Sequence, residues 1–304
     1  MATAANWDKA FLADSRGSSA TRDRAFRTWN ALDKFAKEKK WKLDPASITP
    51  KQMRVYLEGR AGVVSARCVQ LEASHLRRAI AGSGRELGDV RDAKNTWSSA
   101  RMGVPEGSRI GGKAAADLNK WDLAQPKMDK DIHAVTGLVS EIGLRCKEGI
   151  MAAGSLKEWK RELDKPESKE RGCYLNITAG TKGGRPRFTF IPAERVEAVT
   201  AAVTTAQGVA ASQGGNLIDA PDLKSALKRW SNCLARLDLT GTDSGHGLRR
   251  AWAQQQNEYY RNAGMDEKEA LKRLSQDLGH GDGRGRWVAN NYLLGGEGGG
   301  NGTD

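Results

Sequence analysis

The apolar residues of this chain recur mostly at the spacing of an α-helix, and one stretch alone carries a clear β pattern. In residues 20–42, aromatic and aliphatic side chains share one helical face, and lysines and arginines occupy the other. The β pattern covers residues 173–192, where two strand-like runs flank Lys182-Gly183-Gly184-Arg185 and the paired glycines supply the positive φ of a tight hairpin turn. The sequence therefore predicts a mainly α fold with a small β-hairpin.

Helical patterning and glycine content divide the chain into four segments. Residues 1–85 are predicted to form a compact helical domain. Residues 86–126 contain scattered glycines and are predicted to be a partly helical connector. Residues 127–294 are expected to form a second, mixed domain, and the glycine-rich residues 295–304 a flexible tail.

Composition places the chain among globular proteins. Its 304 residues are 38% hydrophobic and 28% charged, which suits two ordinary domains. No apolar run reaches the length of a membrane span, and the N-terminus lacks a signal-peptide pattern. The four cysteines include no C-x-x-C pair, so we expect small core residues and neither a zinc site nor a disulfide framework. The expected location is cytoplasmic, with no membrane partner.

Basic residues are concentrated toward the N-terminus. The chain carries a formal net charge of +12. Residues 1–125 hold 23 basic and 14 acidic residues, a net of +9, whereas residues 126–304 hold 26 and 23, a net of +3. A basic domain of this kind suits contact with a polyanion such as DNA, although basic surfaces also serve solubility alone. The candidate DNA-binding residues of the first domain are Arg54, Arg67, Arg77 and Arg78.

Three short motifs in the second domain join residue types that suit phosphate chemistry. His246 and Arg249 lie three residues apart and would share one face of a helix. Arg145 lies three residues before Glu148, which could orient its guanidinium by a charge-assisted bond. Lys182 lies at the predicted hairpin tip, from which its side chain could enter a cleft. Each motif alone is more often structural than catalytic.

The order of the motifs is more specific than any one of them. Gly-Leu-Arg-x-x-Glu, a hairpin lysine, His-x-x-Arg, Leu-Gly-His and finally a tyrosine follow one another along the chain. This order resembles the tyrosine recombinase (phage integrase) family, and the N-terminal helical module looks like that family's core-binding domain. The resemblance covers nearly the whole chain. It implies a helical core-binding domain plus a mixed α/β tyrosine-recombinase catalytic domain, which together form a clamp on DNA.

The resemblance also implies a role for each motif residue. Arg145 and Arg249 would hold the scissile phosphate, with Glu148 as the organiser of the arginines. His280 would donate a hydrogen bond to the same phosphate, and His246 would assist proton transfer. The catalytic set is completed by Lys182 as general acid and Tyr292 as nucleophile. The product would be a 3′-phosphotyrosyl intermediate with a free 5′ hydroxyl, and no metal or cofactor is expected.

Alternatives remain for the nucleophile and for the activity. The interval from His280 to Tyr292 is longer than is usual in the family, and Tyr259 and Tyr260 are the rival tyrosines. A type IB topoisomerase-like relaxing enzyme and a catalytically inactive DNA-binding protein would share the fold. The leading hypothesis is a site-specific recombinase that integrates or excises a mobile element. Its expected partners are double-stranded recombination sites, three further copies of the chain in a tetramer, and accessory DNA-bending or directionality proteins.

Overall fold

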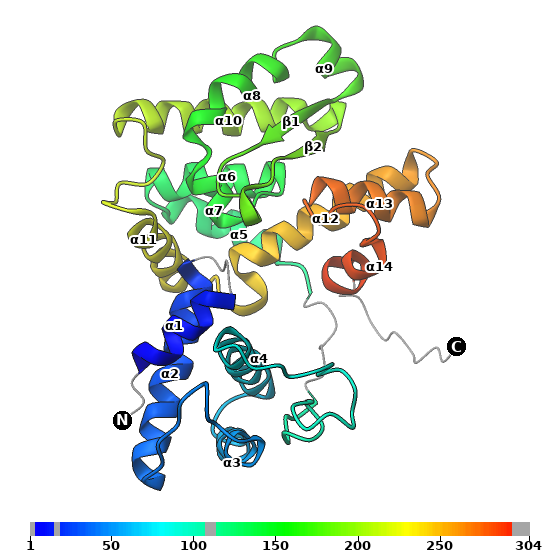
Figure 1. The fold of residues 1–304 in the computed structure, drawn as a ribbon. Coiled ribbons are helices and arrows are strands. Elements are labelled where there is room, and N and C mark those ends of the chain that lie inside the picture. The colour runs from blue at the N-terminus through cyan, green and yellow to red at the C-terminus, as the bar shows by residue number, and fades with distance from the viewer. Residues whose placement is uncertain (1–3, 15–18, 107–113, 294–304) are drawn as a thin grey trace. The chain divides into compact units, whose positions relative to one another are not determined.

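The computed structural model describes residues 4–14, 19–106 and 114–293. The chain divides into two compact units, residues 1–109 and residues 110–304. Within the described residues the fold is mainly helical with one two-stranded sheet, as the sequence predicted (Figure 1). The tail expected at residues 295–304 lies outside these residues. No helix in the described part of the chain has the length and apolar content needed to cross a membrane.

As far as it is described, the first unit is built from four helices and a turn-rich segment. The helices are α1 (Ala4–Asp14), α2 (Ser19–Lys39), α3 (Pro50–Arg60) and α4 (Ala66–Gly82). Thr49 caps α3 by accepting a hydrogen bond from the backbone N–H of Gln52, whose side chain in turn accepts one from the backbone N–H of Thr49. The core gathers large aromatic side chains of α1 and α2, including Trp7 and Trp29, and Trp97 of the turn-rich segment packs into the same core.

The second unit surrounds its core with helices. In chain order these are α5 (Leu118–Ala124), α6 (Lys130–Ile142), α7 (Cys146–Ile150), α8 (Leu156–Leu163), α9 (Pro166–Arg171), α10 (Val196–Ser212), α11 (Leu223–Arg236), α12 (Gly245–Asn262), α13 (Glu267–Asp277) and α14 (Gly285–Val288). The apolar face of α6 packs against α10, and α12 packs beside α6. A π-helical turn, Ala289–Leu293, continues α14 and ends the described chain.

The β-hairpin consists of β1 (Cys173–Ile177) and β2 (Arg187–Ile191), paired antiparallel. Its connection spans residues 178–186 and is longer than the tight turn that the sequence predicted, although Gly183 and Gly184 do adopt positive φ. The extra length lets the connection pack back on α7. A Cβ on Gly180 would lie 2.7 Å from the backbone oxygen of Lys147, so only glycine allows this approach.

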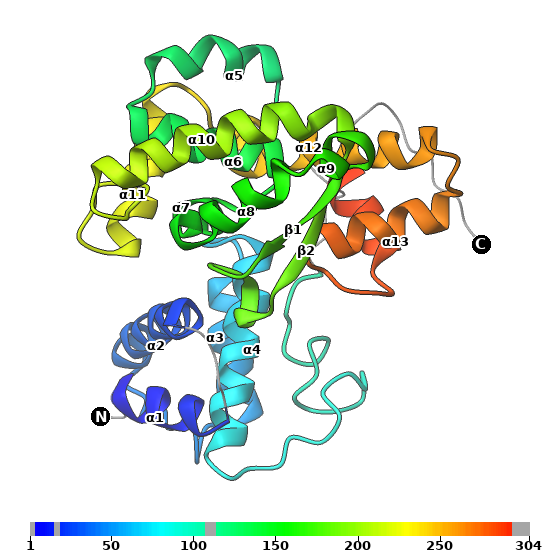
Figure 2. The ribbon, with the colours of Figure 1, turned by 90° about the horizontal axis from the view of Figure 1, so that it is seen from above.

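The outer edge of β2 is joined to the end of α13. The backbone N–H of Phe190 donates to Oδ1 of Asp277 at 3.0 Å, and the Thr189 hydroxyl donates to the backbone oxygen of Asp277 at 3.0 Å. Figure 2 shows β2 running beside α13. These bonds satisfy an otherwise open sheet edge and hold the hairpin against the turn that carries His280.

The burial of the four cysteines agrees only partly with the expectation from the sequence. Cys173 and Cys233 are buried, as expected of small core residues, and Cys146 is half-buried. Cys68 is exposed in the first turn of α4, where its sulfur accepts a hydrogen bond from the N-cap residue Ser65. The expectation that all four cysteines are core residues was therefore wrong for Cys68.

Candidate active site

The first turn of α12 positions His246 and Arg249. Arg249 is fully buried, and its Nη2 donates to the backbone oxygen of Leu278 at 2.6 Å. Its Nη1 donates to the backbone oxygen of Gly143, at the C-terminal end of α6. A buried guanidinium needs such partners, because an unpaired charge in the interior is costly. The side chain is therefore fixed between α6, α12 and the turn after α13.

Glu148 is the centre of a buried ion cluster. Its carboxylate is 2.5 Å from Nη1 of Arg145, 2.7 Å from Nη2 of Arg187 and 3.7 Å from Nη1 of Arg249. It also accepts a hydrogen bond from the backbone N–H of Arg145 at 2.7 Å. Burial alone would raise the pKa of Glu148, but the charges of Arg187, Arg249 and Arg145 outweigh it and lower the pKa to about 2. Glu148 is thus an anion that orients three arginines.

Tyr292 completes the site from the last turn of the described chain. Its hydroxyl accepts a hydrogen bond from Nε of Arg249 at 3.4 Å and lies 3.3 Å from Nε2 of His280. The His246 ring lies 5.7 Å from the Tyr292 ring, centroid to centroid. The π-helical turn brings the hydroxyl to this position, and such turns often occur at functional sites. The structure therefore brings His246, Arg249, His280 and Tyr292 together.

Lys182 and Arg145 line a cleft of about 770 Å³ that reaches His280. Lys182 is exposed at the hairpin tip, and both side chains line the cleft together with His280. Further cations line it: Arg185, Arg187, Arg273 and Arg284. The one lining carboxylate, Asp277, accepts a hydrogen bond from the Tyr260 hydroxyl at 2.6 Å. Such a surplus of cations over anions suits a phosphate backbone.

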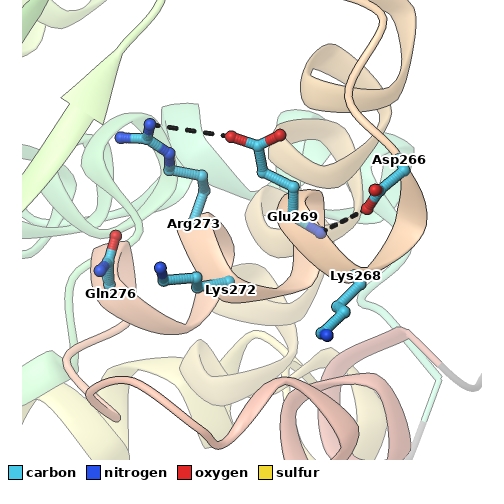
Figure 3. Close-up of a pocket in the computed structure, with 6 residues that line it drawn as sticks. All are labelled: Asp266, Lys268, Glu269, Lys272, Arg273 and Gln276. Atoms are coloured by element: carbon cyan, nitrogen blue, oxygen red, sulfur yellow. Dashed lines mark hydrogen bonds and ion pairs between the residues drawn. The ribbon is translucent and has the colours of Figure 1, made fainter.

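The exposed flank of α13 adjoins this cleft. Asp266 caps the helix by accepting from the backbone N–H of Glu269, and Glu269 pairs with Arg273 at 3.9 Å (Figure 3). Lys268 and Lys272 extend from the same flank. Arg273 is common to the flank and the cleft. None of the residues that surround the Tyr292 hydroxyl lines this flank, so it extends the cationic surface without forming a reaction centre.

The rival tyrosines lie on α12 in a different setting. The Tyr260 ring is buried, and its hydroxyl donates to Asp277 and accepts from Gln256. Burial and the charge of Asp277 raise the pKa of Tyr260, which disfavours the phenolate. Tyr259 packs its ring against Phe190. Neither hydroxyl has an arginine partner among the described residues.

The four arginines predicted to bind DNA differ in how far their side chains are bonded to other residues of the protein. Arg54 pairs with Glu58 one helical turn away, and Arg78 pairs with Asp14 and covers the ring of Phe11. The Nε of Arg77 donates to the backbone oxygen of Trp97 at 2.7 Å, so this side chain anchors the turn-rich segment to α4. Arg67 is exposed and has no ion-pair partner within the described residues. DNA binding by the four remains a prediction.

The two histidines of the site, His246 and His280, have lowered pKa values, which favours their neutral form. Partial burial, with the nearby charges of Arg249 and Arg145, lowers the pKa of His280 to about 3. The ring of His246 packs against Tyr292 while the residue as a whole is exposed; desolvation and the charges of Arg250 and Arg249 lower its pKa as well. Neutral rings can accept a proton, which protonated rings cannot.

We expect His280 in the DNA-free protein to stay neutral down to about pH 5, because an ordinary histidine titrates near 6.5 and this pKa is lowered. The check is an NMR pH titration of the imidazole carbons in the folded protein. The same residue in denaturant provides the reference. A folded-state midpoint near the reference value would contradict the electrostatic description of the site.

The sequence matches a known protein family. A family model described as "Integrase" matches residues 103–255, half of the chain. The chain belongs to the integrase family of tyrosine recombinases. No protein of curated function matches the sequence.

Among the described residues, no group of three or more His, Cys, Asp or Glu side chains is placed to hold a metal ion.

Solved integrases share the fold at low identity. A Tn1549 transposon integrase in complex with transposon right end DNA superposes with a TM-score of 0.57 at 14% identity, covering 96% of this chain and 95% of that one. A lambda integrase dimer bound to a COC′ core site gives 0.56 at 15%, covering 96% and 78%. A lambda integrase tetramer bound to a Holliday junction gives 0.53 at 16%, covering 91% and 76%.

Arg187 was not among the site residues predicted from the sequence. In the structure this arginine is an ion-pair partner of Glu148 and lies on the buried face of β2 with Thr189 and Ile191. A signal was present, because alternation along the strand places residue 187 on the same face as those two residues. A charged residue on a buried face calls for a partner, and Glu148 supplies it.

Proposed function

We propose that the protein is a site-specific DNA recombinase that cleaves one strand with Tyr292 and stores the bond as a 3′-phosphotyrosyl link. The observation that carries this proposal is the setting of the Tyr292 hydroxyl, which lies within hydrogen-bonding distance of both Arg249 Nε and His280 Nε2. Of these residues, His280 also lines the cationic cleft that contains Lys182 and Arg145.

Arg145 and Arg249 supply the electrostatic part of the proposed reaction. A phosphodiester is anionic and resists attack by a phenolate, so its developing charge needs fixed donors. Both arginines are held by Glu148 and by the backbone oxygen of Leu278, to which Arg145 Nη2 donates at 3.1 Å. Because these supports are set before DNA binds, little reorganisation is required at the moment of reaction.

Proton transfers complete the proposed step. The Tyr292 hydroxyl loses its proton to a neutral histidine, His246 by the assignment made from sequence, while its oxygen bonds to phosphorus. The bond from phosphorus to the 5′ oxygen breaks, and Lys182 donates a proton to that oxygen. His280 donates a hydrogen bond to a nonbridging oxygen. The reverse reaction with a 5′ hydroxyl from another strand joins new partners without an external energy source.

The proposed partners are double-stranded recombination sites and further copies of the chain. The solved relatives are complexes with DNA, and one is a tetramer on a Holliday junction. The contacts of Tyr292 with Arg249 and His280 of its own chain support cleavage by each protomer within its own site. The use of accessory DNA-bending or directionality proteins, and the integration or excision of a mobile element, are part of the same proposal.

The test is covalent trapping on DNA that flanks the coding region. Wild-type protein is incubated with nicked suicide fragments, the adduct is isolated in detergent, and the modified peptide is mapped by mass spectrometry. The expected adduct joins Tyr292 to a 3′ phosphate. An adduct at Tyr259 or Tyr260 would overturn the site, relaxation of plasmids of any sequence would favour a topoisomerase, and binding without an adduct would favour an inactive DNA-binding protein.

A further inference from the structure

Arg187 is a buried cation that the proposed reaction does not use. Only 5% of its side chain is exposed, although Arg187 is the first residue of β2 and lines the cleft. Its Nη2 donates to Glu148 Oε2 at 2.7 Å, and its Nη1 donates to the backbone oxygen of Asp277 at 2.5 Å and to the Thr189 hydroxyl. Its Nε has no partner among the described residues.

Arg187 shares one support, Glu148, with the two phosphate-binding arginines. Glu148 contacts all three guanidiniums. Arg145 and Arg249 donate to the backbone oxygen of Leu278, and Arg187 donates to that of the preceding residue, Asp277. One carboxylate and two consecutive carbonyls therefore hold three arginines. A shift of Glu148 or of this turn would move Arg145 and Arg249 together.

The turn before His280 is shaped around the Arg187 side chain. Gly279 has a φ of +67°, and a Cβ added to it would lie 2.5 Å from Cδ of Arg187. Glycine adopts this backbone conformation without strain and leaves the space that the arginine stem occupies. The stem thus lies against the residue that precedes His280.

We propose that Arg187 is a positioning residue that holds Glu148 and the Asp277–His280 turn in register, so that Arg145, Arg249 and His280 meet one phosphate. This inference rests on the proposed function. A guanidinium suits the task because its planar fork can bond a carboxylate and a carbonyl at once. An ammonium offers one point charge and cannot reproduce that geometry.

The test compares two substrates in single-turnover cleavage. One suicide substrate carries an ordinary scissile phosphodiester, and the other carries a neutral methylphosphonate at that position. A neutral linkage needs less charge neutralisation, so a defect that acts through the two arginines should matter less on it. Because each variant's two rates come from one preparation, any unfolded fraction cancels in their ratio.

The expected result for Arg187→Met is a loss of about 100-fold on the phosphodiester, the size of effect that a small misplacement of catalytic groups produces. The loss on the methylphosphonate should be at least about tenfold smaller. Arg187→Lys should show the same pattern in a milder form, and in both variants DNA affinity should fall far less than the phosphodiester rate. The second variant keeps the charge and guards against a folding defect in the first.

Arg229→Met provides the matched control. Arg229 bonds the buried carboxylate of Asp131 at 3.0 Å and the backbone oxygen of Asp219 at 3.1 Å, and none of these residues lies in the ion cluster of Glu148. This variant should lose stability but keep the wild-type rate on both substrates. Equal losses for an Arg187 variant on both substrates, or loss of the folded state in both variants, would assign Arg187 to stability and overturn the inference. Absence of any adduct with wild-type protein would instead count against the proposed function.

Discussion

Replacing Tyr292 by phenylalanine is expected to abolish the covalent protein–DNA adduct and leave DNA binding intact. The change removes the one atom that would bond to phosphorus, so the loss should exceed about 10⁴-fold, as for other covalent nucleophiles. The ring would stay in place because it packs in an apolar cluster with Trp252, Leu274, Leu278 and Val288. Within the described part of the chain the hydroxyl makes only two long contacts, at 3.3 and 3.4 Å, so its removal should cost little stability. Adduct yield on suicide substrates and affinity by gel shift provide the two measurements.

The rival tyrosines supply the controls for this experiment. Tyr259→Phe should form the adduct at the wild-type level, since its hydroxyl bonds to no residue in the described part of the chain. Tyr260→Phe should also form it, with a loss of about 1 kcal/mol in the free energy of unfolding because its hydroxyl bonds the buried Asp277. Adduct formation by Tyr292→Phe, together with its loss in either control variant, would move the nucleophile to α12.

The hairpin shows how far local sequence patterns reach. Alternating burial along β1 and β2 follows the period of two in the sequence, and the glycines that the turn needs do adopt positive φ. The length of the connection was not predictable, because it depends on packing between residue 180 and α7. That contact joins segments far apart in the sequence, and a pattern confined to one strand contains no information about it.

In the site, too, local spacing predicted some contacts, whereas contacts between distant segments were not predictable. The spacing of Arg145 and Glu148 indicated an oriented arginine, and the structure contains that pair. The spacing could not reveal that Glu148 also holds Arg187, because this ion pair joins α7 to β2. It also could not reveal how His280 meets Tyr292 across a glycine-rich turn. A π-helical turn closes that interval, and the Tyr292 ring packs in an apolar cluster with residues of α12 and α13, a contact that local spacing does not reveal.

Replacing Lys182 by alanine is expected to slow cleavage of an ordinary substrate by about 10³-fold, the typical contribution of a general acid. The lysine lies at the exposed hairpin tip and lines the cleft with Arg145 and His280, so its ammonium can reach a leaving oxygen beside the phosphate. Without that proton the 5′ oxygen must depart as a strongly basic alkoxide. The loss should be largest in the step that breaks the bond from phosphorus to oxygen, and single-turnover rates at saturating protein will show it.

A substrate with sulfur in place of the bridging 5′ oxygen separates general acid catalysis from binding. A thiol has a pKa of about 8.5 and leaves readily as the thiolate, so it needs no proton from the enzyme. Lys182→Ala should therefore cleave the sulfur substrate at nearly the wild-type rate. Arg185→Ala removes another cation from the same hairpin tip, and any loss it causes should be equal on both substrates because an arginine stays protonated. Equal losses for Lys182→Ala on oxygen and sulfur substrates would show that Lys182 only attracts DNA, and the donor of the proton would then have to be sought elsewhere along the cleft.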